Sequence, residues 1–455
     1  MKKSIIFFLL LFCSFFSIYA QRKLSLPELL LMAEESELRQ ADTLAIASAI
    51  AEEQQARTAF YPRLSAQASY FRIQRPLMLF TAEQFFAAFE KLDPLRPFLD
   101  DFSQRINEAV KMDLHNTFFV NFSLVQPLFM GGKLNALNKM ASTGVHAQRL
   151  KALKERADRQ IKIEKDYYDL IKAEAIDQLF SQYIKKIDTL VYHVEMLKEE
   201  GYANKADLLE MRLLRSKIVK EQANASAHLP ILRKKLAIDA GLGEEEEITP
   251  ATTIEQLEEE AHRLLSPGTI SPDDSLREST KEQLLDMATN IEKQKIIVAQ
   301  ADMLPRVAAM ANYTLLSPNP FNGMTKKMGG SWSLGITLQI PITEILSGYY
   351  ARKAAKLKAT IAEIDALNKK KLIALERSNA RAEMEHAQQA YSRSIVQKED
   401  AQENLQLAEE GYHEGVVDME KYVRALSNWL EVASTHIISL TELFSKYSFY
   451  RYTQL

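Results

Sequence analysis

The residue types that most often perform catalysis or bind metals are present in this chain, but they are scattered. The eight histidines form no close-spaced set with cysteine, aspartate or glutamate of the kind that a metal site requires. His193 lies within a helical repeat, where packing or exposure explains it better than ligation. The run from Glu244 to Glu247 is interpreted as a solvated loop rather than as a cation site. We therefore expect no catalytic residues, no metal, no cofactor and no enzymatic activity.

The first 20 residues have the features of a signal peptide. A charged start precedes an apolar run over 5–16, and Ala20 supplies a small residue for cleavage. This run is too short for a transmembrane helix. Cys13, the only cysteine, lies within it, so the mature chain needs no disulfides. An exported chain without cysteine fits a bacterial envelope.

Composition narrows the function further. Without Lys2 and Lys3, the mature chain has 55 basic residues against 60 acidic ones, and it contains no basic block that indicates nucleic-acid binding. After the signal peptide there is no run of about 18 apolar residues, the length typical of a membrane-spanning helix. If the chain crosses a membrane, we expect it to do so with the strands of a barrel.

Three landmarks occur twice in the same order, which indicates an internal duplication. They are a Pro-Arg step (62–63 and 305–306), a strand ending on proline (Pro127 and Pro341) and the sequence Glu-Glu-Gly-Tyr (199–202 and 409–412). We expect two structural repeats, each consisting of a helix, a β-hairpin and a long helical pair. The predicted divisions are a signal peptide (1–20), the first repeat (21–243), an acidic linker or equatorial segment (244–280) and the second repeat (281–455).

Four segments alternate apolar and polar residues as strands do: 64–73, 118–126, 307–316 and 331–340. In the last segment Trp332, Leu334, Ile336 and Leu338 share one face, whereas Thr337 lies on the other. About 9–11 residues is the length of a tilted strand that crosses a bilayer. A half-buried sheet in a soluble domain would alternate in the same way, but the export signal and the duplication favour the membrane. Four strands cannot close a membrane barrel, so if these strands span a membrane, several copies must share one barrel.

Long helices dominate the rest of the chain. The segments 145–200, 349–410 and 416–455 contain neither glycine nor proline. Their apolar residues step by four and three, which predicts coiled-coil packing. Each long helix is expected to end at the glycine of the repeated Glu-Glu-Gly-Tyr sequence, Gly201 or Gly411, with a second helix after the turn. We also expect a partly helical loop at 80–114.

In these features the chain resembles the TolC-like outer membrane efflux proteins. The resemblance covers nearly all of the mature chain. It rests on the signal peptide, the doubled Pro-Arg step, the glycine-containing turns, the sequence Gln126-Pro127-Leu128-Phe129-Met130-Gly131-Gly132 and the helix end at Leu242-Gly243. It implies a mostly α fold with a small β part and two structural repeats per chain. A trimer would share a 12-stranded transmembrane β-barrel, which continues into a long α-helical coiled-coil barrel.

The resemblance also implies a function. The trimer would be the exit duct of a tripartite efflux system for small molecules, in the bacterial outer membrane with a large periplasmic portion. Its implied partners are two further copies of itself, a periplasmic adaptor (membrane fusion) protein, an inner-membrane pump of the RND or ABC type, and outer membrane lipid. One alternative is the exit duct of a type I protein secretion system. Another, from a different class, is a periplasmic coiled-coil scaffold.

Two groups of functional residues follow from the resemblance. The turns that would dock the adaptor contain Gly201, Tyr202, Asn204, Lys205, Asp207, Gly411, Tyr412 and Gly415. Members of the family place acidic residues just after the second turn, where they narrow the pore and favour cations. Asp418 matches the first such position, but Lys421 stands where a second acid is often found. Glu414 or Glu420 could contribute to the constriction instead.

Overall fold

The computed structural model describes residues 22–74, 77–78, 111–112, 116–201, 204–243, 246–265, 278–322 and 327–454. These residues fall into two compact units. Unit 1 comprises Met1–Ser48, His146–Met287 and Ile364–Leu455, and unit 2 comprises Ala49–Val145 and Ala288–Glu363. The predicted signal peptide lies outside the described residues, and so does nearly all of the predicted loop at 80–114.

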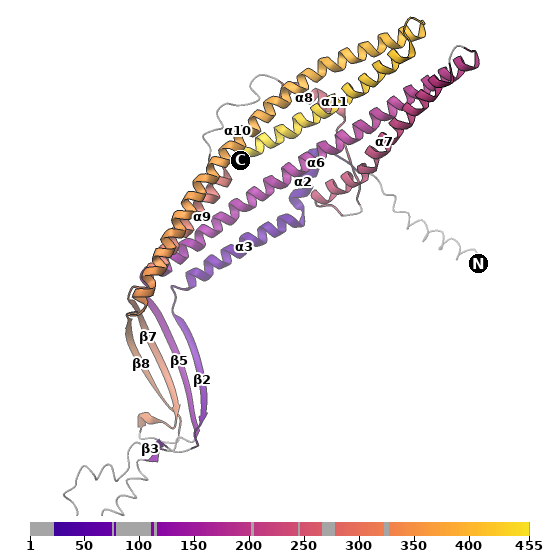
Figure 1. Ribbon diagram of the computed structural model, residues 1–455. Coiled ribbons are helices and arrows are strands. Elements are labelled where there is room, and N and C mark those ends of the chain that lie inside the picture. The colour runs from indigo at the N-terminus through magenta and orange to yellow at the C-terminus, as the bar shows by residue number, and fades with distance from the viewer. Residues whose placement is uncertain are drawn as a thin grey trace, which may run out of the picture. The chain divides into compact units, whose positions relative to one another are not determined.

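Helices make up most of the described chain (Figure 1). They are α2 (Leu26–Glu35), α3 (Glu37–Thr58), α6 (Lys133–Glu199), α7 (Lys205–Asp239), α8 (Ile254–Leu264), α9 (Thr280–Ala301), α10 (Glu344–His413) and α11 (Met419–Thr453). The strands are β1 (Arg22–Leu24), β2 (Arg63–Arg72), β3 (Leu77–Met78), β4 (Lys111–Met112), β5 (Asn116–Phe129), β6 (Ile248–Pro250), β7 (Arg306–Ser317) and β8 (Gly329–Gln339). A 3-10 turn, η3 (Pro320–Asn322), follows β7.

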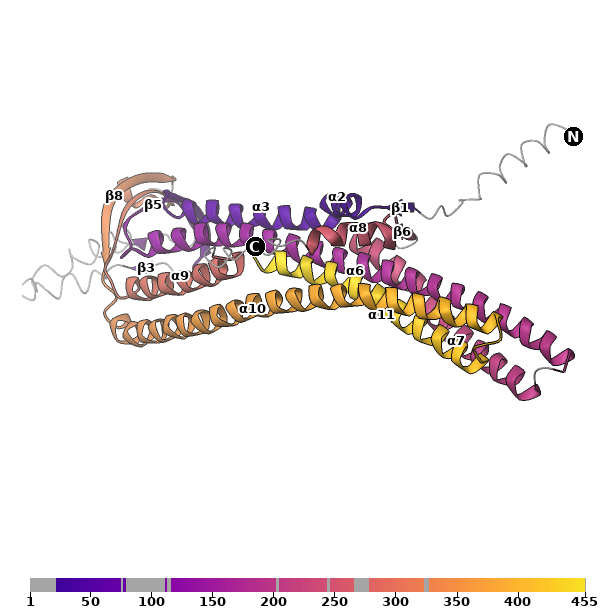
Figure 2. The same cartoon turned by 90° about the horizontal axis from the view of Figure 1, so that it is seen from above.

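The helical pairs of unit 1 pack as the heptad pattern predicts. Figure 2 shows α10 beside α11, and α6 and α7 form the other pair. The apolar positions of α6, among them Tyr183, Ile187 and Val194, are buried in one cluster with residues of α7, α10 and α11. Leu426 and Leu440 of α11 are likewise inaccessible to solvent. A repeat of 3.5 residues keeps such side chains on the seam between helices, so this part of the prediction is confirmed.

A second core in unit 1 joins the short elements to the two long helical pairs, α6 with α7 and α10 with α11, which we call the rods. β1 and β6 pair in parallel, with Arg22 opposite Ile248. Tyr167 of α6 is buried beneath them, and its hydroxyl donates to Thr252 Oγ1 at 2.9 Å. Ile248 and Leu257, from the segment expected to be an acidic linker, are also buried in this core. That segment therefore contains a strand and an amphipathic helix, α8, that pack against the rods.

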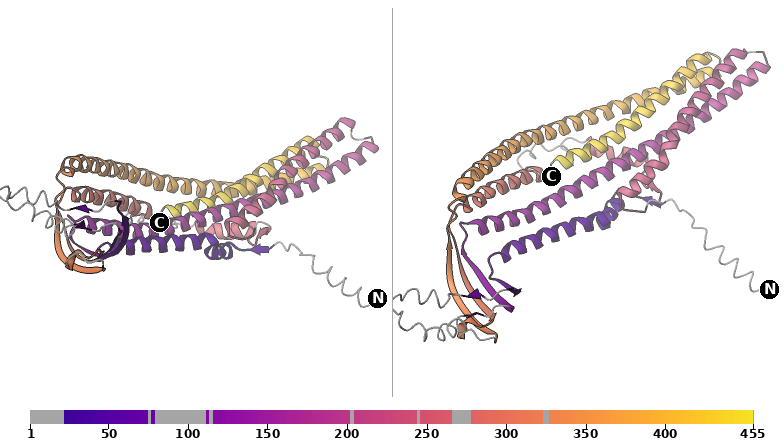
Figure 3. Two further views of the ribbon diagram at one scale, coloured as in Figure 1. Left: turned by 90° about the horizontal axis from the view of Figure 1, so that it is seen from below. Right: turned by 60° about the horizontal axis from the view of Figure 1, so that its bottom comes forward.

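Unit 2 contains the four strands that alternation predicts. They form one antiparallel sheet in the order β2-β5-β7-β8. Figure 3 shows the strands side by side and curved along their length. The observed strands have 10 to 14 residues; β5, β7 and β8 are longer than the predicted segments, whereas β2 has the same length. The extension is ordinary, because strand ends are the least certain part of a pattern-based prediction.

Candidate functional site: a two-faced sheet and two helical turns

One face of the unit 2 sheet is apolar across all four strands. Because directly opposed residues point to the same face, the register identifies whole rows. One row runs Leu64–Leu124–Ala311–Leu334, and the next runs Ala66–Phe122–Tyr313–Trp332. On the outer strand β8, Trp332, Leu334 and Ile336 are each more than 70% exposed. No soluble core in this unit covers them, so the sheet presents a continuous apolar surface.

The other face of the sheet is polar in the corresponding rows. These rows are Ser65–Ser123–Asn312–Ser333 and Gln67–Asn121–Thr314–Ser331. Thr314 donates to Asn121 Oδ1 at 2.9 Å, which joins two neighbouring strands through their side chains. Polar side chains on one face and exposed apolar side chains on the other are the pattern of a sheet between lipid and water.

The sheet has two open edges. β2 and β8 each pair on one side only, to β5 and β7 respectively, within the residues that the structure describes. Open strand edges carry unpaired backbone groups that readily bind another strand. In lipid, such unpaired backbone groups would cost several kcal/mol each.

The first helical turn lies in unit 1 between α6 and α7. Gly201 has φ +86°, a conformation that glycine adopts without strain, and α6 ends just before it as predicted. Asn204 and Lys205 are exposed at the start of α7. Asp207 lies within α7, and Tyr202 lies outside the described residues.

At the second turn, the predicted end of the helix at Gly411 is wrong. α10 continues through Gly411 and Tyr412 to His413. The residue with positive φ is Gly415, at +74°. Val416 N–H donates to Gly411 O at 2.8 Å and Gly415 N–H to Tyr412 O at 3.1 Å, which is the Schellman pattern of a helix end. Gly411 accepts the closing hydrogen bond, while Gly415 supplies the left-handed residue.

The four candidate constriction residues lie together at this second turn. Asp418 is the N-cap of α11, and its Oδ1 accepts from Lys421 N–H at 2.8 Å. Glu420 pairs with Arg424 one turn along the same helix, and Glu414 is exposed just after α10. Asp418 therefore caps the N-terminus of α11. Its place in a pore stays a prediction.

Beside the turns is a cavity that the sequence did not reveal. We call it the turn cavity; it has a volume of about 280 Å³ and is lined by Lys185, Lys186, Thr189, Leu190, His193, Glu409, Tyr412, His413 and Tyr422. Lys186 pairs with Glu409 at 3.1 Å across α6 and α10. Burial, together with the charge of Glu409, raises the pKa of Tyr422. No local motif marks this cavity, because its walls come from segments more than 200 residues apart.

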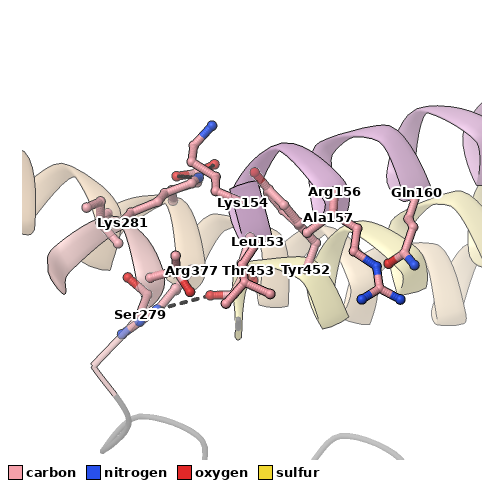
Figure 4. A pocket seen from close by; sticks show the side chains of 13 residues that line it. Leu153, Lys154, Arg156, Ala157, Gln160, Ser279, Lys281, Arg377, Tyr452 and Thr453 are labelled. Carbon is pink, nitrogen blue, oxygen red and sulfur yellow. Dashed lines mark hydrogen bonds and ion pairs between the residues drawn. The ribbon is translucent and has the colours of Figure 1, made fainter. Parts of the chain in front are cut away.

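A second cavity, of about 260 Å³, lies where α11 ends and α9 begins (Figure 4). Arg377 of α10 crosses this junction. Its Nε donates to Thr453 O at 3.1 Å and its Nη2 to Glu282 Oε2 at 3.0 Å. Lys281 pairs with Glu376 at 2.9 Å. The four cations that line this cavity, Lys154, Arg156, Lys281 and Arg377, each have a carboxylate partner, so the described lining offers no free positive charge to an anionic ligand.

A buried polar network fastens α8 to the rods. His436 of α11 is 3% exposed. Its Nε2 lies 2.8 Å from Glu258 Oε1, and its Nδ1 lies 3.0 Å from Ser394 Oγ. The order Ser-His-Glu is that of a hydrolase triad, but Ser394 is 2% exposed and donates to Tyr391 O at 2.8 Å. The serine hydroxyl is closed to substrates, so the network is structural.

The described residues contain no grouping of three or more His, Cys, Asp or Glu side chains that could hold a metal ion.

Within the described parts of the chain, no helix combines the length and the apolar character needed to cross a membrane.

Comparison with known proteins identifies the fold. No protein-family model matches the sequence, and no curated protein matches it. Solved structures do match. The outer-membrane channel OprN aligns over 94% of this chain and 89% of its own, with a TM-score of 0.75 and 15% identity. The alignment with the CmeC outer membrane channel of Campylobacter jejuni covers 94% of this chain and 85% of that channel, with a TM-score of 0.76 and 13% identity. The alignment with the outer membrane protein VceC of Vibrio cholerae covers 94% of this chain and 95% of that protein, with a TM-score of 0.73 and 13% identity.

These likenesses each extend over 94% of this chain. At this level of identity they establish the architecture. The chain has the fold of the TolC-like outer membrane channels.

Proposed function

We propose that the chain is one subunit of a homotrimeric exit duct in the bacterial outer membrane, serving a tripartite system that exports small molecules. The observation that carries the proposal is the unit 2 sheet, with its exposed apolar face, its polar face and its two open edges. The structural neighbours described as outer membrane channels support it.

The open edges support the presence of more than one copy in the barrel. Four strands are too few to close a membrane barrel, for which about eight is the smallest known number. Three chains with four strands each would supply twelve, with β8 of one chain beside β2 of the next. The apolar rows would then face lipid, and the rows that contain Asn121 and Thr314 would line the lumen.

The helix that follows the sheet supports contact between copies. Within unit 2, α10 exposes an apolar stripe of Leu346, Tyr350, Leu357 and Ile361, each more than 55% exposed. These residues recur at intervals of four and seven, which places them on one side of the helix. A stripe of this kind is unfavourable in water, so we assign it to the neighbouring subunit. Tyr349 and Tyr350 would also lie close to the membrane interface, where tyrosine is common.

The two helical turns in unit 1 would bind the partner proteins of the duct. The surfaces around Gly201 and Gly415 would receive a periplasmic adaptor, which connects the duct to an inner-membrane pump. Asp418, with Glu414 or Glu420, would contribute negative charge to the entrance and favour cations. A soluble scaffold would need the rods but would have no use for the exposed apolar face of the sheet.

The test compares substitutions on the two faces of one strand. Leu334→Arg and Ile336→Arg place a charge on the apolar face, at a cost of about 2–4 kcal/mol near the middle of a bilayer. Thr337→Arg places the same charge on the polar face. We expect the first two variants to lose the heat-modifiable oligomer from the outer membrane fraction, while the Thr337 variant assembles. Equal assembly of all three would overturn the membrane assignment.

A gene deletion then distinguishes export of small molecules from protein secretion. If the duct exports small molecules, loss of the gene lowers the inhibitory concentrations of drugs or metal salts, and the Thr337→Arg gene restores them only in part. If susceptibility is unchanged while a secreted protein disappears from the medium, the duct belongs to protein secretion instead.

A further inference from the structure

Two histidines meet across the helical pairs of unit 1. His193 lies in the last two turns of α6, and His413 is the final residue of α10. Their ring centroids are 5.9 Å apart and the ring planes cross at 79°. Both rings line the turn cavity. This contact belongs to neither the docking turns nor the constriction residues, so the proposed function leaves it unexplained.

The charges around the two rings are unbalanced. From α6, Lys185 and Lys186 line the same cavity; from α10 comes Glu409, and from α11 comes the phenol of Tyr422. Glu409, the only carboxylate in this lining, already pairs with Lys186.

Two acidic residues of this part of α6 are also occupied. Asp188 and Glu195 pair with Arg215 and Arg212 of α7. Among the residues that the structure describes, Lys185 has no ion pair. Within the cavity lining, a proton added to either ring therefore meets the ammonium group of Lys185, while the one carboxylate there, Glu409, is paired with Lys186. Outside the lining, Glu410 and Glu414 lie close to His413 along the chain.

We propose that His193 and His413 form an acid-sensitive contact, which loosens α6 from α10 beside the turns when both rings are protonated. Histidine is the side chain that ordinarily changes charge between pH 5 and 8. When both rings carry a proton, His193 faces the positive charges of His413 and Lys185 across the cavity.

The size of the effect follows from the ring separation. Two unit charges about 6 Å apart in a partly hydrated cavity repel enough to shift the opening equilibrium about 3- to 10-fold. The contact is local, so the rest of each rod remains packed through buried residues such as Ile187 and Leu405.

Amide hydrogen exchange of the purified protein at pH 8 and pH 5 tests the inference. Rates in the segments 187–199 and 402–413 are corrected for the intrinsic effect of pH. We expect the unmodified protein to lose protection about 3- to 10-fold at pH 5. In His193→Gln and His413→Gln the loss should fall below about twofold, since neither can hold two charges. His386→Gln, an exposed histidine elsewhere on α10, is the matched control and should behave like the unmodified protein.

Two results would overturn the inference. One is an equal loss of protection in the unmodified protein and in His193→Gln. The other is greater protection at pH 5, which would mean that a shared proton tightens the contact. Neither readout involves transport, so the inference and the proposed channel function can fail separately. Circular dichroism at pH 8 confirms that the variants are folded before they are compared.

Discussion

Arg377 offers a sharp prediction, because one side chain connects the end of α11 to the beginning of α9. Its guanidinium donates to Thr453 O at 3.1 Å and to Glu282 Oε2 at 3.0 Å. Both side chains of the ion pair are 15% exposed, so water screens the pair only in part. A hydrogen bond to a charged group is worth about 1.5–3 kcal/mol. Arg377 makes two such bonds, and after a discount for the remaining exposure we expect Arg377→Gln to destabilise the junction by about 2–3 kcal/mol.

Local exchange is the suitable assay, because global unfolding of a large chain with two compact units is not a two-state process. Amides in the last two turns of α11 and the first turn of α9 should exchange roughly 30- to 150-fold faster in the variant, by the equivalence of 1.4 kcal/mol and a factor of ten. Arg381→Gln is the control, because Arg381 pairs with Glu385 on the same exposed face of α10. Junction exchange that is the same in both variants would refute the reasoning.

The same variant has a defined pH dependence. Burial raises the pKa of Glu282, but hydrogen bonds from Ser279 and the charge of Arg377 outweigh it, so the net pKa is below the ordinary 4.5. A lowered pKa contributes stability that is present above 4.5 and is lost as the pH falls through the folded value. The difference between Arg377→Gln and the unmodified protein should therefore shrink as the pH drops below about 4.5.

Two further predictions concern α11 and α8. Asp418→Ala removes the N-cap and should weaken the first turn of α11 by about 0.5–2 kcal/mol, visible as faster exchange there and restored by Asp418→Asn. If Asp418 also lines the pore, Asp418→Ala lowers cation selectivity in planar bilayers and Lys421→Asp raises it; an unchanged reversal potential in both would remove it from the constriction. The hydrogen bond from His436, supported by Lys398, lowers the pKa of Glu258 to about 2. The contribution of ionised Glu258 to the stability of the fold is present above pH 4.5 and is lost as the pH falls toward 2. Amide exchange in α8 should therefore accelerate between these pH values, and Glu258→Gln should abolish this pH dependence.

The sheet and the rods could be predicted because their patterns are local and strongly periodic. The alternation in 331–340 placed Leu334 and Thr337 on opposite faces, as the register confirms. The spacing of Tyr183, Ile187 and Leu190 predicted a buried seam, and all three are buried. In both cases the periodicity of the element alone decides which side chains share a face.

Features that depend on distant parts of the chain could not be predicted. The pairing of β1 with β6 joins residues more than 200 positions apart. Because no local pattern reveals this pairing, the sequence alone indicates only a linker for α8 and its neighbours. The contact between His193 and His413 and the junction at Arg377 depend on how α6, α9, α10 and α11 lie together. At the second turn the sequence offers two glycines, and only the backbone hydrogen bonds show that Gly415, rather than Gly411, takes the left-handed conformation.

The most direct test of the central claim asks whether the apolar face of the sheet touches lipid. The chain has two tryptophans: Trp332 is 71% exposed on β8, and Trp429 packs among the helices of unit 1. The purified protein would be reconstituted into vesicles whose lipids carry bromine on the acyl chains, which quenches only nearby indoles. With Trp429→Phe, the fluorescence of Trp332 should be strongly quenched; with Trp332→Phe, that of Trp429 should not. Equally weak quenching in both variants would contradict the assignment of this sheet to the membrane.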